Sequence, residues 1–251
     1  MTDLHTHLLP ALDDGAADME KALELLRRQS AQGVRQIALT SHYRPDKTDI
    51  PTFLERRAAA WRTLSSHPDV QAMNCTLKLG AEVEYAPQLM QTDVRPLCLE
   101  GTNVLLLELQ VRHRPQFLGR MLDCLQEDGI VPLIAHAERY DYVQENPALL
   151  MDWADRGAYI QINGGSLLRK DKQGKMAMKM IQWGLAHVVA SDTHSPEKRP
   201  PCLQEAMALV TQKLGERTAR RLQNNASLLF DGEEPDLCAV TMPRKIGPWW
   251  I

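Results

Sequence analysis

The stretch NVLLLELQ, residues 103–110, decides the fold class. Four apolar residues follow one another before Glu108, and such a continuous run is typical of a strand that is covered on both faces. Parallel sheets contain strands of this kind, because their crossover connections place helices on both sides of the sheet. The run therefore predicts an α/β fold, which requires helical segments between the other strands of the chain.

Helical and strand-like patterns do alternate along the sequence. The segment 18–33 has apolar residues at helical spacing and ends at a glycine, and 34–42 has the pattern of a buried strand. We expect further strands at 2–7, 76–85, 103–110, 130–139, 158–164 and 186–194. We expect further helices at 50–67, 115–129, 146–157, 175–184, 202–215 and 216–230. Seven strand–helix repeats without a linker predict one barrel-like α/β domain over residues 1–230, followed by a C-terminal tail at 231–251.

Composition excludes several classes of protein. The chain has 251 residues, enough for one large α/β domain, and its formal net charge of −3 gives no indication of a nucleic-acid-binding or membrane-binding surface. No stretch approaches the roughly 20 apolar residues that a membrane-spanning helix needs. The five cysteines are scattered, with no C-x-x-C pair and no apolar N-terminal signal segment, so we expect reduced thiols in a cytoplasmic protein.

Polar side chains stand where the predicted strands end. In α/β barrels the carboxyl ends of the strands form the mouth that holds ligands. Burying many imidazoles and carboxylates in one mouth is costly unless a cation binds them. The residues at these positions are His5, His7, His42, Glu82, Glu84, Glu108, His136, Glu138, Arg139, Asp192 and His194.

A polynuclear metal site is the economical explanation of this set. His5 and His7 are two apart in a strand, so their imidazoles point to the same side. Imidazole and carboxylate ligands without thiolate suit Mn²⁺, Zn²⁺ or Fe²⁺. Two or three such ions can activate water and hold a phosphoryl group, and Arg139 and Arg199 offer forked donors for phosphate oxygens. The combination predicts phosphoester hydrolysis.

Six motifs resemble one family in their order along the chain. They are DLHTHLLPALDDG, TSHY, GAEVEY, LIAHAERY, QINGGSL and ASDTHSPEKRPP. This order is similar to that of PHP-domain (polymerase and histidinol phosphatase) proteins, and specifically to the PHP-type protein-tyrosine phosphatases of bacterial capsule and exopolysaccharide biosynthesis. The resemblance covers about residues 2–230. It implies a distorted seven-stranded (β/α)7 TIM-like barrel of the PHP type with three divalent metal ions, manganese first, with zinc or iron as alternatives.

The resemblance also implies roles for individual residues. The first ion would be held by His5, His7, Glu82 and Asp192. Glu82 would bridge to a second ion that also binds Glu108 and His136, and a third ion would be held by Asp14, His42 and His194. Arg139 and Arg199 would bind the substrate phosphate, and with His42 and His194 they are the predicted catalytic residues. The implied substrate is the phosphorylated tyrosine tail of a bacterial tyrosine kinase that governs polysaccharide export.

Other interpretations use the same residues. A small-molecule PHP phosphatase such as histidinol-phosphatase would share the metal set, and a metal-binding scaffold that docks a kinase would be expected to lack a ligand. A DNA-editing PHP domain would need a basic stripe, which the acidic chain lacks. Cys238 and Arg244 have the spacing of a cysteine-phosphatase signature, but a proline interrupts the loop. The segment 167–175 is predicted to be a solvated loop, which at the mouth, with Arg112 and Arg114, would meet a phosphorylated partner.

Overall fold

A computed structural model describes residues 1–247 and 249–250, and it has the expected parallel α/β architecture. The strands form a three-stranded sheet in the order β1-β2-β4, a six-stranded sheet in the order β3-β5-β6-β7-β8-β9, and a two-stranded antiparallel pair, β10-β11. Every pairing within the two larger sheets is parallel. The strands are β1 (Thr2–Thr6), β2 (Gln36–Leu39), β3 (His42–Tyr43), β4 (Thr76–Leu79), β5 (Glu82–Glu84), β6 (Val104–Glu108), β7 (Val131–Ile134), β8 (Tyr159–Asn163), β9 (Val188–Ala190), β10 (Lys245–Ile246) and β11 (Trp249–Trp250).

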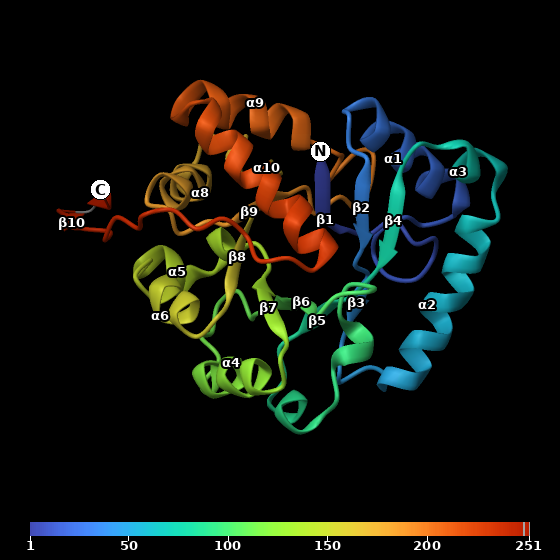
Figure 1. Cartoon of the computed structure of the whole chain (residues 1–251), viewed down its shortest axis with the longest axis horizontal. Helices are drawn as coiled ribbons and strands as arrows, with labels where there is room; N and C mark the ends of the chain where they lie inside the picture. The colour runs from blue at the N-terminus through green and yellow to red at the C-terminus, as the bar shows by residue number, and fades with distance from the viewer. Residues whose placement is uncertain (248, 251) are drawn as a thin grey trace.

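Helices connect the strands and cover the sheets from outside (Figure 1). They are α1 (Met19–Ala31), α2 (Ile50–Ser65), α3 (Pro68–Ala72), α4 (Leu118–Glu127), α5 (Asp141–Glu145), α6 (Leu149–Asp155), α7 (Gly164–Leu167), α8 (Lys172–Gln182), α9 (Leu203–Leu214) and α10 (Glu216–Asp231), with the 3₁₀ turns η1 (Pro87–Gln91), η2 (Arg95–Leu97) and η3 (Ala137–Arg139).

The expected closed barrel of seven continuous strands differs from the observed sheets. The predicted strand at 34–42 is divided into β2 and β3, and the one at 76–85 into β4 and β5. The Cα register nevertheless runs on, because Leu39 pairs with Leu79 and His42 pairs with Glu82. Each of the two predicted strands is therefore interrupted by a short irregular segment, at 40–41 in one and at 80–81 in the other. On the other side, β1 and the chain after β9 share only an isolated bridge, so the sheets are not closed.

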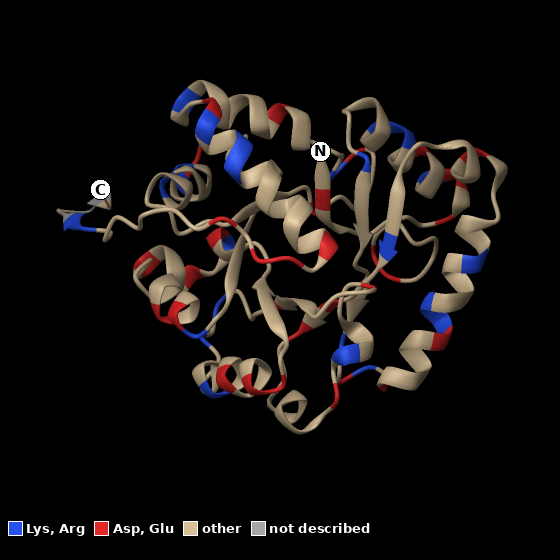
Figure 2. Cartoon of the chain, viewed as in Figure 1, with Lys and Arg blue, Asp and Glu red and all other residues tan. Residues whose placement is uncertain are grey.

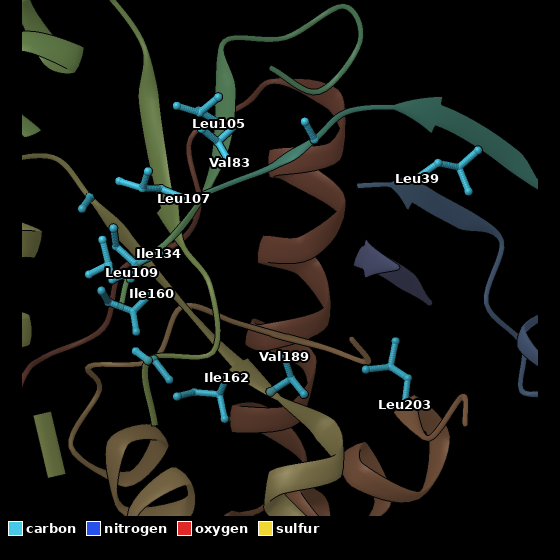
Figure 3. Packing of buried hydrophobic residues seen from close by; sticks show 14 of the residues in the cluster. Leu39, Val83, Leu105, Leu107, Leu109, Ile134, Ile160, Ile162, Val189 and Leu203 are labelled. Atoms are coloured by element: carbon cyan, nitrogen blue, oxygen red, sulfur yellow. The ribbon is translucent and has the colours of Figure 1, made fainter. Parts of the chain in front are cut away.

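Strand β6 confirms that both faces of the central strands are covered. Leu105 and Leu107 belong to the large cluster beneath the outer helices, whereas Val104 and Leu106 belong to a second cluster that includes Phe230 of α10. Figure 3 shows side chains of the first cluster from neighbouring strands following one another across the sheet. A strand with apolar contacts on both sides needs the continuous apolar run that the sequence shows.

The outer helices begin and end where their sequence signals stand. The Asp18 side chain accepts a hydrogen bond from Lys21 N at the start of α1, and Gly33 follows the helix with a φ of +79°. The predicted loop at 167–175 is wrong in its second half, because Asp171 caps α8 and the helix begins at Lys172. In Figure 2 the charged residues lie mostly on the outer helices and loops, while the visible strands are mostly tan. The charged and polar residues at the strand ends are therefore an exception to this distribution.

The segment after α10 runs back along α8 and α10 (Figure 1). Asp236 accepts from Asn224 through its side chain, and its backbone exchanges hydrogen bonds with the Asn225 side chain. Thr241 N donates to Trp183 O at 2.8 Å. All five cysteines are free, as expected. Among the described residues, no helix combines the length and the apolar character that crossing a membrane requires.

Candidate functional site

Six polar residues gather where the strands of the sheets end. His5 lies in β1, His42 begins β3, Glu82 begins β5 and Glu108 ends β6. His136 and Asp192 lie two residues after the ends of β7 and β9, with positive φ values of 33° and 55°. A non-glycine residue adopts this backbone conformation at a cost in free energy, and strained residues of this kind are commonly found at functional sites. The turn at each strand end thus directs a side chain into the cluster.

Glu82 lies at the centre of the cluster. Its Oε2 atom lies 3.1 Å from His5 Nε2, 3.2 Å from His7 Nε2 and 3.0 Å from His42 Nδ1. Its other oxygen, Oε1, lies 2.9 Å from His136 Nε2. The Glu82 side chain is 1% exposed, so water does not solvate this carboxylate.

The cluster has polar atoms that its own residues do not satisfy. Glu82 Oε2, His42 Nδ1, His136 Nδ1 and His194 Nε2 are buried and lack a hydrogen-bond partner. His5 Nε2 also lies 3.1 Å from His7 Nε2, a pair of imidazole nitrogens turned toward each other. Buried polar atoms without partners are rare and costly. Lone pairs that converge in this way fit divalent cations, which bind imidazole and carboxylate together.

Potential ligand atoms come together in three overlapping groups. Within each group they lie within 4.8 Å of one another. The groups are His5, His7 and Asp192; His42, Glu82 and Glu108; and His7, Asp14, His42 and His194. His136 belongs to none of them, but its Nε2 lies 3.5 Å from Glu108 Oε1 as well as beside Glu82. All nine residues expected to bind metal therefore lie in one continuous cluster.

Burial and charge shift the pKa values in the cluster in opposite directions. Burial, assisted by the charge of Glu82, raises the pKa of Glu108 to about 7. Burial would also raise the pKa of Asp192, but His5 and the other imidazoles lower it to about 2. Burial opposes protonation of His7, yet its hydrogen bonds to Asp13 and Glu82 raise its pKa to about 10. A proton therefore competes with a cation for His7, and binding of a cation by His7 must release that proton.

Arg139 and Arg199 meet at the same carboxylate. Arg139 Nη1 lies 3.3 Å from Asp192 Oδ2, and Arg199 Nη1 lies 3.4 Å from the same oxygen. Arg199 Nη2 also donates to Asp14 Oδ2 at 3.2 Å. The arginine side chains are 34% and 39% exposed, so both guanidinium groups lie at the open edge of the cluster. The two arginines expected to bind phosphate therefore lie beside the residues expected to bind metal.

Asp13 is a site residue that the sequence reasoning missed. Its Oδ2 lies 2.7 Å from His7 Nδ1 and accepts from the backbone N of His42 at 2.9 Å. An ionised carboxylate can only accept, so His7 Nδ1 donates and its Nε2 turns toward Glu82. The signal was present in the sequence, since two aspartates follow the H-x-H motif, but only Asp14 was assigned.

Gln161 and Asn163 of β8 were also missed. Gln161 Oε1 lies 3.1 Å from His5 Nδ1 and accepts from His136 N at 2.8 Å. Gln161 Nε2 donates to Asn163 Oδ1, and Asn163 Nδ2 donates to Asp192 Oδ2, both at 2.7 Å. These amides orient the side chains of His5 and Asp192, which are expected to bind metal. No pattern of charge marks an amide in a strand, and their one signal is that both belong to the motif QINGGSL, residues 161–167.

Two polar residues at strand ends lie outside the cluster. Glu84 approaches Arg44 at 3.7 Å, and the buried Glu138 accepts from Asn163 N at 3.3 Å. Cys238 is exposed, and in the described part of the chain no helix follows it. A cysteine-phosphatase loop opens a helix, so the Cys238–Arg244 spacing is coincidental, as predicted.

Comparisons with known proteins agree with this site. The family described as capsular polysaccharide synthesis, CpsB/CapC, matches residues 1–230. The tyrosine-protein phosphatase YwqE of Bacillus subtilis is 32% identical over 238 residues, 92% of this chain and 91% of that protein. The tyrosine-protein phosphatase CpsB of Streptococcus pneumoniae is 30% identical over 243 residues, 92% of this chain and 99% of that protein.

Solved structures give the same result. A crystal structure from work on YwqE and CpsB, described as unique metal-dependent tyrosine phosphatases, superposes with a TM-score of 0.89 and 28% identity, over 98% of this chain and 100% of that chain. The lactonase Lmo2620 of Listeria monocytogenes superposes with a TM-score of 0.50 at 12% identity, over 90% of this chain and 93% of its own, and shares the fold alone.

Proposed function

The chain belongs to the CpsB/CapC family of capsular polysaccharide synthesis proteins, and from this premise we propose that it is a metal-dependent protein-tyrosine phosphatase. It hydrolyses phosphotyrosine on a cognate bacterial tyrosine kinase and so regulates capsule or exopolysaccharide synthesis. The observation that carries the proposal is the convergence of Arg139 and Arg199 on Asp192 beside the cluster around Glu82. Hydrolysis of a phosphate ester needs both the arginines, which would bind the phosphate oxygens, and the cluster around Glu82, which would hold the metal ions.

We assign three divalent cations to the cluster, manganese first, with zinc and iron as alternatives. His5, His7, Glu82 and Asp192 would hold the first. Glu82, Glu108 and His136 would hold the second, and Asp14, His42 and His194 the third. The unpartnered atoms of Glu82, His42 and His194 support this assignment. When bound, the cations would supply positive charge for the phosphoryl oxygens and lower the pKa of water to near neutrality.

The chain's own residues orient the substrate. Arg139 and Arg199 bind phosphoryl oxygens with forked donors and keep the ester beside Asp192. His42 and His194 approach Asp14 Oδ1 at 3.4 and 3.6 Å. Asp14 is 57% exposed and so lies at the edge that a substrate reaches first, and we assign a catalytic role to the two histidines behind it, which are 11% and 3% exposed. A phenol leaves without a strong acid, because its pKa is about 10.

The remaining predictions extend this proposal. We interpret the two larger sheets as one distorted seven-stranded (β/α)7 barrel of the PHP type, because the register of β2 with β4 continues into that of β3 with β5. We place the catalytic domain at residues 1–230 and treat 231–251 as a tail. A cytoplasmic location agrees with five free thiols.

The test measures hydrolysis and metal content together. The full chain is loaded with manganese, zinc or iron, its metal content is determined by elemental analysis, and catalytic efficiency is compared on a phosphotyrosine peptide, a phosphoserine peptide and histidinol phosphate. We expect three ions per chain, loss of activity on chelation, and preference for phosphotyrosine. Preference for histidinol phosphate would replace the proposal with a small-molecule phosphatase. Full activity of metal-free protein would refute the metal mechanism.

Arg139→Ala and Arg199→Ala separate phosphate binding from structural support. Both variants should lose turnover on every phosphoester while thermal stability and metal content stay near those of the wild type. Lysine should restore little, because a point charge does not reproduce the fork. Loss of folding in either variant would assign that arginine to a structural ion pair.

A further inference from the structure

A cavity of about 720 Å³ opens beside the two arginines. Its wall includes Arg139, Asp192 and Arg199, and it continues away from the cluster past Leu168, Arg169 and Lys198. We call it the lateral cavity. A substrate whose phosphate lies on the arginines has the rest of its molecule next to this space.

Hydrogen bonds order the two walls of the lateral cavity. On one side, Gln173 Nε2 donates to Ser166 Oγ at 2.9 Å and joins α8 to α7. On the other side, Lys198 N donates to Ser195 Oγ at 3.1 Å, and His194 N donates to Arg199 O at 3.0 Å. Both walls are thereby fixed relative to the strand ends that carry the proposed ligands.

The chemistry of the walls combines apolar surface with positive charge. Leu168 is 37% exposed, one of five large apolar residues in the described chain with that much exposure. Lys198 has no carboxylate within 4.0 Å among the described residues, whereas Arg169 is paired with Asp171. The opposing charges on the wall are Asp192 and Glu205. This is a basic, partly apolar surface on a chain whose net charge is −3.

We propose that the lateral cavity binds the polypeptide that carries the phosphotyrosine and selects acidic residues next to it. Leu168 contacts the aromatic ring or a neighbouring apolar side chain, and the Lys198 ammonium binds an adjacent Asp or Glu. The inference rests on the proposed function and adds a sequence preference to it. Long-range attraction between opposite charges also favours encounter with an acidic segment.

A second hollow provides the matched comparison. It has about 520 Å³ and is lined by Arg114 and Phe117, near the ends of β5 and β6. Phe117 is 47% exposed and so resembles Leu168 in apolar character, while Lys213, exposed in the last turn of α9, resembles Lys198 in charge. The second hollow has neither of the phosphate-binding arginines on its wall. Equivalent substitutions at Lys213 and Phe117 therefore distinguish a specific subsite from general surface charge.

The experiment uses the metal-loaded full chain and three substrates. They are p-nitrophenyl phosphate and two phosphotyrosine peptides that differ only in carrying Glu or Lys on both sides of the phosphotyrosine. For Lys198→Glu, we expect about a tenfold fall in kcat/KM on the Glu peptide, mainly through KM, a gain on the Lys peptide, and no change on p-nitrophenyl phosphate. Leu168→Ser should raise KM for both peptides. Lys213→Glu and Phe117→Ser should leave all three substrates unchanged.

The outcomes separate the two proposals. Equal effects of Lys198→Glu and Lys213→Glu, or no effect of Lys198→Glu on the Glu peptide, would overturn the lateral cavity proposal while the phosphatase proposal stands. Loss of p-nitrophenyl phosphate hydrolysis in Lys198→Glu would assign Lys198 to the catalytic machinery and overturn its role as a specificity residue. A metal-loaded wild type that hydrolyses histidinol phosphate but neither peptide would overturn the phosphatase proposal, and the lateral cavity proposal with it.

Discussion

Glu82 and Leu106 are paired in the register of β5 and β6, yet Glu82 belongs to a polar region of the molecule and Leu106 to an apolar one. Leu106 packs in an apolar cluster with Leu133 and Phe230. Glu82 is as deeply buried but has charged and polar neighbours, and one of its oxygens lacks a hydrogen-bond partner. The apolar region stabilises the fold, and the polar region beside it is held in a costly arrangement that suits cation binding. Each prediction below tests this division.

The largest effect is expected for Glu82→Gln. The substitution removes the carboxylate that four imidazoles face, so metal content should fall and activity should drop by more than about 100-fold, beyond the loss usual for outer contacts of a metal site. Stability should change less than metal content, because glutamine keeps the volume of glutamate and its side chain can still form hydrogen bonds with the imidazoles. Elemental analysis, turnover and urea unfolding measure the three quantities. Retained metal content would contradict the central role of Glu82.

Leu106→Ala should show the reverse pattern. Removing a buried leucine leaves a cavity and costs about 2–5 kcal/mol of unfolding free energy. Metal content and turnover per folded molecule should stay near those of the wild type. Urea unfolding at a fixed metal concentration checks the first value, since bound metal itself contributes to stability. A variant that unfolds no more easily than the wild type would show that the apolar region does not support the strand ends.

His187 offers a buried histidine outside the cluster. Burial lowers its pKa to about 4, and its Nδ1 accepts a hydrogen bond from Ile160 N. A lowered histidine pKa gives stability that is complete above about pH 6.5 and is lost as the pH falls toward 4, by about 3 kcal/mol in all. Between these pH values the wild type should therefore lose more unfolding free energy than His187→Gln. Equal pH dependence in the two proteins would contradict this.

Asp13→Asn should have a smaller effect that is confined to the polar region. The variant keeps the size of the side chain but loses the charge that orients His7, so metal affinity should fall about 10- to 100-fold. Competition with a chelator measures the affinity. Asp18→Asn is the control, because Asp18 only caps α1 and an asparagine caps as well. Equal losses in both variants would indicate a general charge effect.

The smallest effect is expected for Cys238→Ser. Cys238 is exposed and lies in the segment after α10, away from the residues that gather around Glu82. Turnover and metal content should both equal those of the wild type. A large loss of turnover would revive a thiolate mechanism and end the assignment of catalysis to the polar strand ends.

The sequence by itself determined the alternation of strands and helices and most of the polar residues that gather around Glu82. Both are local properties: apolar periodicity defines each element, and the carboxyl ends of parallel strands meet at one edge wherever they lie in the chain. His5, Glu108 and Asp192 could therefore be placed together before the structure was known. A local pattern also identified the helix caps at Asp18 and Gly33.

Only the tertiary structure decided how these groups are oriented. Three features depend on how distant segments of the chain pack together. They are the division of the predicted strands at 34–42 and 76–85, the contact of both arginines with Asp192, and the hydrogen bonds of Asp13 and Gln161 to the histidines. A carboxylate or an amide has the same local pattern whether it faces water or an imidazole. Its role is fixed by the partner that folding brings within hydrogen-bond distance, and that partner is not a property of its own stretch of sequence.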